Sequence, residues 1–438
     1  MTFPLGVVLF AVGIGLSIAL HEFGHLLTAK AFGMKATQYF IGFGPTLFSF
    51  RRGETEYGLK AIPAGGFVKI VGMTPQEEEE GGRPAGGPHS GWSQSGLGAG
   101  ARVARPQPGH SGAAAGSRAF WRFPAWKRVT VLTAGSAMHF VIALVAIYGA
   151  AVTSGLPTDK AIVGELQPCV VTVGSTDGRV RACQPGDPAS PAADAGLRSR
   201  DEITRVGDTP VRTFEDLVTA LRANPGRTLP ITYRRDGVER TTMVSIEPVR
   251  RAPIGSEEKG SDGLARVGAI GVAPALAERH GPAGAVPATF RFTGTVVAGT
   301  FGALKTLPSK VPQLLDALAG EQRDPAGPVS VVGVSRVGGQ ALEAGSVLFF
   351  VMLLAGFNIF VGVFNLFPLL PLDGGHIAIV LFEKVRSWVA RLLGRADPGR
   401  VDYAKLMPLT MLVIAVFGGI SLLAILADIV NPIANPFQ

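Results

Sequence analysis

Lysine and arginine are missing from both ends of this 438-residue sequence, and all 41 of them lie between Lys30 and Lys405. Charged residues make up only 17% of the chain, whereas hydrophobic residues make up 47%. This composition excludes an ordinary soluble domain. A bilayer span needs about 20 largely apolar residues, and four windows meet that need: 3–20, 129–154, 347–370 and 406–430. The sequence therefore predicts a polytopic α-helical membrane protein with four transmembrane helices.

Two further features are also absent. No basic stretch precedes the first window and no small-residue cleavage site follows it, so we expect this window to stay as a membrane helix. Basic stripes interleaved with aromatic residues are missing, so the net charge of +8 does not indicate a nucleic-acid partner. The short connections 30–128 and 376–405 are basic, and the positive-inside rule places both in the cytoplasm. Both termini and the long region 155–346 are then extracytoplasmic.

Cysteine is scarce as well, because the sequence holds only Cys169 and Cys183. Both fall in the region that the charge pattern places outside the cytoplasm, where a disulfide persists. A bridge between them, closing a short loop, is therefore predicted. Two free thiols in an apolar sheet are the alternative.

Glycine and proline residues separate the predicted elements in the rest of the chain. Apolar runs in 31–74 alternate with Gly and Pro, which predicts a small β-sheet at the membrane face. Residues 75–117 are dominated by Gly, Pro, Ser, Ala and an acidic run, which is typical of a disordered loop. Residues 287–320 have an apolar side interrupted by Lys and Pro, which favours amphipathic helices on the outer membrane surface. A fifth span is the alternative for that stretch.

Residues 160–250 predict a compact α+β module. Its expected elements include a helix over 213–223 and a hairpin that turns at Asp236-Gly237. The stretch "SPAADAGLRSRDEITRVGDTPV" resembles a PDZ domain of the kind attached to bacterial proteases. The predicted organisation is, in chain order, a first transmembrane helix (1–30), a membrane-associated sheet (31–74), a cytoplasmic loop (75–117), a second transmembrane helix (118–154), the PDZ-like domain (160–250), a juxtamembrane region (251–342), a third transmembrane helix (343–375), and a cytoplasmic loop with the fourth transmembrane helix (376–438).

The motif that points to chemistry is "HEFGH" at residues 21–25. On a helix, positions i and i+4 share one face, so His21 and His25 can hold one zinc ion. Glu22 then lies beside the metal, where it can take a proton from the water that zinc acidifies. Two histidines bonded to helix carbonyls are the alternative.

A catalytic zinc site usually has a third protein ligand and one open position. The best candidate is Asp373 in "FNLFPLLPLDGGH", since it is the first acidic residue after Glu343 and follows an apolar window. The first and third windows run in the same direction, so HEFGH and Asp373 end at the same, cytoplasmic depth. His376 is the alternative ligand.

Two prolines, Pro368 and Pro371, interrupt the third window before this aspartate. Proline frees helix carbonyls, and broken backbone at membrane depth is tolerated where it lines a wet cavity. Asn365 lies one turn before Pro368, and its amide could donate to the oxyanion of a tetrahedral intermediate. A hydrogen bond between helices is the alternative for Asn365.

Together, "HEFGH", "GFGP", "AIPAGGFVKIVGM", the PDZ-like stretch and "NLFPLLPLDGG" resemble the site-2 protease family of intramembrane zinc metalloproteases, in particular its bacterial branch that cleaves membrane-bound anti-sigma factors. The resemblance implies Zn²⁺ held by His21, His25 and Asp373. It also implies a catalytic Glu22 and a substrate-supporting Asn365.

One stretch departs from the family pattern. Members of this branch commonly carry Gly-Pro and Asn in the second span, where this chain reads "AGSAMHF" with Ser136 and His139. His139 is expected within possible reach of the site, as a hydrogen-bond donor near the ligands or as a substrate contact. A histidine bonded within the helix bundle is the favoured alternative.

The resemblance implies an endopeptidase of the cell membrane that cuts transmembrane segments of single-pass proteins after an earlier external cut. A non-catalytic scaffold that binds peptides through the PDZ-like domain would have a damaged metal site, whereas all three ligands are present here. A zinc transporter would have polar residues distributed through its spans, and these spans are almost free of charge.

Overall fold

The computed structural model describes residues 2–73, 117–171, 183–184, 187–251, 265–275, 277–321, 323–324 and 327–437. The chain forms two compact units, one of residues 1–150 with 286–438 and the other of residues 151–285. The loop predicted over 75–117 lies, apart from its last residue, outside the described part.

Four helices in the described residues are long and apolar enough to cross a membrane: α1 (Thr2–Ala31), α4 (Ala125–Thr153), α9 (Val347–Asn365), and the run Tyr403–Val430, which comprises the 3₁₀ turn η3 (Tyr403–Leu406) and α11 (Met407–Val430). They agree with the four predicted windows. The third ends five residues earlier than predicted, at Asn365. A non-helical turn containing Pro368 and Pro371 follows it, because proline lacks the amide hydrogen and its ring obstructs the preceding turn.

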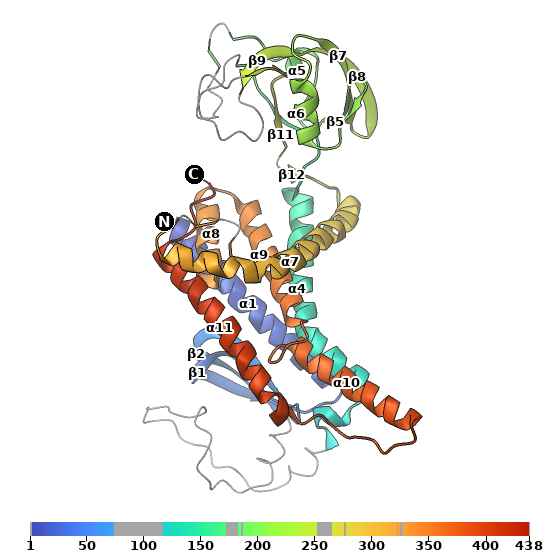
Figure 1. The fold of residues 1–438 in the computed structure, drawn as a ribbon, viewed down its shortest axis with the longest axis vertical. Coiled ribbons are helices and arrows are strands. Elements are labelled where there is room, and N and C mark those ends of the chain that lie inside the picture. The colour runs from blue at the N-terminus through green and yellow to red at the C-terminus, as the bar shows by residue number, and fades with distance from the viewer. Residues whose placement is uncertain are drawn as a thin grey trace. The chain divides into compact units, whose positions relative to one another are not determined.

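Where the structure describes this unit, its other helices are η1 (Phe120–Arg122), α7 (Pro282–Leu318), α8 (Val331–Glu343) and α10 (Asp373–Leu392). α7 is one continuous helix where more than one amphipathic helix was predicted, and it is not among the four described helices that are apolar enough to span a membrane. It runs across the spans in Figure 1, and Leu314 near its end packs against Ala424 and Ala427 of α11. α10 corrects another expectation, since residues predicted as a loop after 376 are helical up to Leu392.

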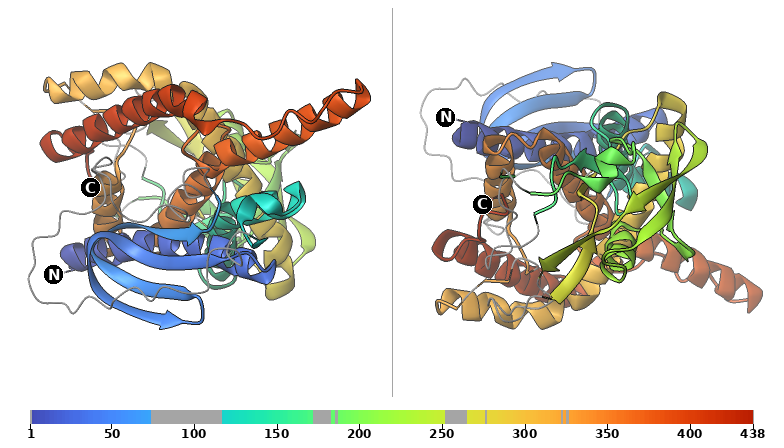
Figure 2. Two further views of the ribbon diagram at one scale, coloured as in Figure 1. Left: turned by 90° about the horizontal axis from the view of Figure 1, so that it is seen from below. Right: turned by 90° about the horizontal axis from the view of Figure 1, so that it is seen from above.

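Both chain ends lie toward one end of this unit, and the small sheet lies toward the other end (Figure 1). The sheet consists of β1 (Ala36–Arg52) and β2 (Thr55–Ile70), and Figure 2 shows it beside α1. Residues 38–41 of β1 pair both with 56–59 and with 66–69 of β2, so the start of β1 is central and residues 66–70 flank it. The sheet is fixed to the helices by an apolar cluster that includes Leu26 of α1, Ile70 of β2 and Leu132 of α4.

The described residues of the second unit form two helices and ten strands: α5 (Pro191–Asp194), α6 (Phe214–Arg222), β3 (Leu156–Pro157), β4 (Val163–Leu166), β5 (Glu202–Val206), β6 (Thr209–Pro210), β7 (Thr228–Arg235), β8 (Val238–Ser245), β9 (Glu247–Arg251), β10 (Ala265–Ala269), β11 (Val272–Pro274) and β12 (Ala277–Glu278). Its largest sheet has the order β6-β5-β7-β8, and β9 pairs with β10, β4 with β11 and β3 with β12. These last pairs carry the unit beyond the predicted boundary at 250.

Local sequence signals explain two elements of this unit. Asp236 and Gly237 have φ values of 52° and 80°, which is the positive pair that a tight β7–β8 hairpin requires. Thr213 caps α6 through a reciprocal pair of hydrogen bonds with Asp216. Backbone amides of Thr213 and Arg212 donate to the Asp216 carboxylate and lower its pKa. The predicted disulfide is confirmed, because Cys169 and Cys183 are bonded.

Candidate metal centre

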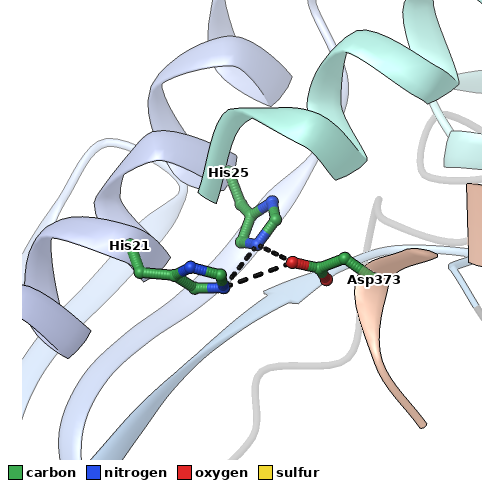
Figure 3. A group of neighbouring side chains, drawn as sticks. All are labelled: His21, His25 and Asp373. Atoms are coloured by element: carbon green, nitrogen blue, oxygen red, sulfur yellow. Dashed lines mark hydrogen bonds and ion pairs between the residues drawn. The ribbon is translucent and has the colours of Figure 1, made fainter. Parts of the chain in front are cut away.

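Helix α1 places His21 and His25 one turn apart, with both side chains buried. Their Nε2 atoms lie 3.1 Å apart, and the two rings are nearly perpendicular (Figure 3). Two nitrogen atoms this close and aimed at the same point suit a shared cation. The i, i+4 spacing in the sequence therefore produces the convergence that it predicted.

Asp373 comes to the same point from the first turn of α10. Its Oδ2 lies 3.3 Å from Nε2 of His21 and 3.3 Å from Nε2 of His25 (Figure 3). The turn 366–372 folds back tightly on this helix start. A Cβ at Gly375 would lie 2.6 Å from the backbone of Leu369 and of Leu370, so glycine after the aspartate lets the turn close.

Helix α4 supplies the third wall of the site. The backbone oxygen of Val131 lies 2.7 Å from Nδ1 of His25, so this nitrogen carries the hydrogen and donates it. The donation leaves Nε2 of His25 with a lone pair directed at Asp373, which is the form that binds a metal. A Cβ at Gly135 would lie 2.6 Å from Nε2 of His21 and closer still to Nε2 of His25, so a glycine keeps the space beside both nitrogens open.

The donor set fits zinc. His21, His25 and Asp373 form the group of His, Cys, Asp or Glu side chains, among the residues that the structure describes, whose ligand atoms all lie within 4.8 Å of one another. Two imidazoles and one carboxylate leave one position of a tetrahedral ion for water or substrate, as in catalytic zinc sites.

The other predicted site residues lie around this group. Glu22 is half-buried, and it lies beside β2, since a Cβ at Gly66 would lie 3.3 Å from Cγ of Glu22. Asn365 is half-buried at the last position of α9, and its proposed contact with an oxyanion stays a prediction. His376 is outside the converging group, and its ring stacks against Tyr403 at a centroid distance of 5.9 Å.

His139 lies within reach of the site, as expected for the stretch that departs from the family pattern. Its ring centroid is 5.0 Å from that of His21, and the residue is buried. Nδ1 of His139 lies 2.8 Å from Oδ1 of Asn358 in α9, and an amide oxygen only accepts, so His139 donates. One of the two ring nitrogens of His139 is therefore bonded within the helix bundle, as the alternative expects.

Three features of this site carry no motif in the sequence. The carbonyl of Val131 is a backbone group, and every residue has one. Gly135 lies in the "AGSAMHF" stretch that departs from the family pattern, but a glycine in a membrane helix is common. Asn358 lies in a uniformly apolar run, where a lone amide is the one signal that could have singled it out.

We expect one zinc ion per chain. Asp373→Ala should weaken zinc binding by more than the ~10–100-fold that the loss of an outer hydrogen-bond partner costs, because it removes a direct ligand. His376→Ala is the matched control on the same helix and should keep zinc. Metal analysis of both purified variants checks this prediction. If the His376 variant loses zinc and the Asp373 variant keeps it, His376 is the third ligand and Asp373 is not.

Comparison with known proteins agrees with this geometry. The profile of peptidase family M50 matches residues 9–393. The chain is 43% identical over 440 residues to the zinc metalloprotease Rip1 of Mycobacterium bovis and 41% identical over 445 residues to Rip1 of Mycolicibacterium smegmatis, with 99% of each chain covered in both comparisons. It is 26% identical over 431 residues to the zinc metalloprotease RasP of Oceanobacillus iheyensis, covering 87% of this chain and 91% of that one. The chain is therefore a zinc metalloprotease of peptidase family M50, the site-2 protease family, and Zn²⁺ is its cofactor.

Proposed function

We propose that this protease hydrolyses a peptide bond within the transmembrane segment of single-pass membrane proteins of the anti-sigma factor type, after an earlier external cut. The observation that carries the proposal is the meeting of His21, His25 and Asp373 inside a unit built from four apolar helices. Two of these ligands lie on a candidate span itself, and the third begins the helix after another span.

The chemistry follows from the residues around the ligands. Zinc, when bound by His21, His25 and Asp373, supplies Lewis acidity that activates water and polarises the scissile carbonyl. Glu22 accepts the proton of the attacking water as the new C–O bond forms, and it returns this proton to the leaving amine as the tetrahedral intermediate collapses and the peptide C–N bond breaks. The amide of Asn365 is proposed to donate to the developing oxyanion.

The small sheet is proposed to hold the substrate extended. A helical peptide bond is shielded by its neighbours and paired internally, so a transmembrane helix must unwind before it is cut. Residues 66–70 of β2 flank the central segment of the sheet and pass close to the catalytic glutamate, since a Cβ at Gly66 would lie 3.3 Å from Cγ of Glu22. A substrate strand added beside this segment would run along the site.

The experiment that tests this function uses purified protein in lipid vesicles with a panel of single-pass membrane peptides. Cleavage inside the apolar segment is expected with zinc and should stop on addition of a chelator. Cleavage that persists in the chelator, or that is confined to soluble peptides, would contradict the proposal. Cleavage of peptides derived from anti-sigma factors in preference to other single-pass segments would support the finer substrate assignment.

The orientation in the cell membrane rests on the loop charges, which place the basic connections in the cytoplasm and the termini and second unit outside. The positions of both chain ends in Figure 1, away from the sheet, agree with it. With both native cysteines in a disulfide, new cysteines can be labelled selectively. An impermeant thiol reagent should label Glu239→Cys in intact cells, and Glu54→Cys only after permeabilisation. The reverse pattern would invert the orientation.

The second unit is proposed to be a PDZ-like filter that excludes substrates with an intact external domain. The ends of the unit lie together, because Leu156 pairs with Glu278 and the amide of His280 donates to the carbonyl of Ala151. Residues 156–278 can therefore be replaced by a short linker. We expect the shortened protein to keep zinc, since all candidate ligands lie in the other unit, and to cut untrimmed substrates faster than the full chain does.

Delivery of the trimmed substrate is the alternative role of this unit. A groove between α6 and the strands β10 and β11 is lined by Phe214, Leu217, Leu221, Val272, Arg222 and Arg251, and the two guanidinium groups suit the new carboxylate of a trimmed chain. Under delivery, both the deletion and Arg251→Gln should slow cleavage of trimmed substrate. Under filtering, Arg251→Gln should leave both rates unchanged, and measuring trimmed and untrimmed substrates side by side separates the two roles.

A further inference from the structure

Helix α10 has two apolar faces, and the rest of the chain covers one of them. Val380 on the covered face belongs to the cluster that includes Leu26 of α1 and Val131 of α4. Past the first turn, the buried residues of α10 are Ile379, Val380, Glu383 and Ala390, and they lie on one side of the helix. The other face carries side chains that are 40–65% exposed: Leu381, Phe382, Val385, Trp388, Val389, Leu392 and Leu393.

The exposed side chains form a continuous stripe. At 3.6 residues per turn they fall within an arc of about 140°, wide enough for a helix that buries this face in an apolar medium. Basic residues flank the stripe on both sides, with Lys384 and Arg391 along one edge and Arg386 along the other. Basic flanks beside an apolar stripe are the pattern of helices that lie at the surface of anionic membranes.

The contacts of α10 show at which end of the candidate span α4 this helix lies. Glu383 forms an ion pair with Arg128 at 3.2 Å, and both side chains are largely buried. Arg128 lies in the first turn of α4, so the middle of α10 lies at the end of that candidate span. Trp126 in the same turn is 60% exposed, as is typical of side chains at the boundary between bilayer and water.

We infer that the exposed face of α10 lies in the interfacial layer of the lipid bilayer, with Lys384, Arg386 and Arg391 on anionic headgroups. The inference rests on the proposed function only in taking α4 and α9 as membrane spans. It gives α10 a second role. The helix that begins with the candidate ligand Asp373 is held by protein on one face and by lipid on the other, so the headgroup composition acts on the element that positions this ligand.

Spin labels on single cysteines test the inference in the full-length protein in vesicles. Val385→Cys reports the stripe, Arg391→Cys reports the basic edge, and Phe360→Cys on the exposed side of α9 reports the spans. In vesicles containing phosphatidylglycerol, the label at 385 should be accessible to oxygen and shielded from a water-soluble nickel complex. The label at 391 should show the reverse.

Charge supplies the second arm of the test. Arg386 donates to the carbonyls of Pro398 and Gly399, so the charge variant leaves it intact. In the protein labelled at 385, Lys384→Glu with Arg391→Glu should make the label more accessible to nickel in phosphatidylglycerol vesicles, because each basic residue at an anionic surface contributes about fivefold in membrane affinity. The same substitutions should have little effect in phosphatidylcholine vesicles. An equal effect in both lipids would remove the headgroup contact.

Two outcomes would overturn the lipid contact itself. A label at 385 as accessible to nickel as the label at 391 would place the stripe in water. A label at 385 that is immobilised and shielded from both reagents would mean that protein covers it, for instance a second copy of the chain. Exposure of the label at 360 to nickel would instead contradict the assignment of spans, so the two failures are distinguishable.

Discussion

Glu22→Gln is expected to lower cleavage of a membrane-embedded peptide bond by more than about a hundredfold, the lower end of general-base contributions, while zinc stays bound. Glutamine has nearly the size of glutamate, so the close contact of its side chain with Gly66 is kept. The amide cannot accept a proton from water, and the ligand contacts among His21, His25 and Asp373 do not involve position 22. The cleavage rate and the zinc content are measured on the same preparation.

Glu343→Gln is the matched control, because this glutamate is exposed at the end of α8 and belongs to the same unit. It should cleave at the unaltered rate. Near-normal turnover of the Glu22 variant would remove Glu22 from the mechanism. Loss of zinc together with activity would show instead that position 22 supports the ligands, and the chemical role would then pass to another group.

The candidate ligands were predictable from the sequence because each is marked by local chemistry. An ionisable residue at the end of an apolar run has to be offset by a partner, and His21 and His25 share a helix face by their spacing alone. Asp373 is marked by its isolation after an apolar window and by the charge asymmetry that sets the direction of the spans. None of these signals depends on how the helices pack.

The walls of the site could not be predicted, because they depend on packing between distant segments. The carbonyl that orients His25 belongs to Val131, 106 residues away, and the amide that orients His139 belongs to Asn358, 219 residues away. Without an arrangement of helices, nothing distinguishes Val131 from its neighbours, and the amide of Asn358 stands out in its apolar run without showing which side chain it contacts.

Two boundaries differ between prediction and structure for physical reasons. In the sequence, the many charges of α10 resemble those of a connection between spans, and basic residues interrupt its apolar stripe from Leu381 to Leu393. The polar residues after 250 predict the end of the second unit there, but β10 follows them and pairs with β9, and β11 pairs with β4. Strand pairing across a long connection leaves no local periodicity to follow.

Gly135→Ala is expected to abolish stoichiometric zinc binding although position 135 holds no ligand atom. Its methyl group would lie 2.6 Å from Nε2 of His21 and nearer to Nε2 of His25, where both nitrogens must face the metal. Non-bonded carbon atoms do not approach nitrogen so closely, so the rings or α4 must move. Displacing both imidazoles should cost at least the ~100-fold in affinity at the upper end of what a lost outer partner costs.

Gly149→Ala is the matched control on the same helix, since a Cβ there meets nothing within 4 Å. Alanine is favoured over glycine in a helix interior by about 1 kcal/mol, so neither substitution weakens α4 through its own propensity. The control should therefore bind zinc and cleave substrate normally, while the Gly135 variant inserts into the membrane and lacks the metal. Metal analysis and cleavage of both variants decide the matter. Full zinc content in the Gly135 variant would mean that α4 does not press against the ligands, and the wall of the site would have to be assigned elsewhere.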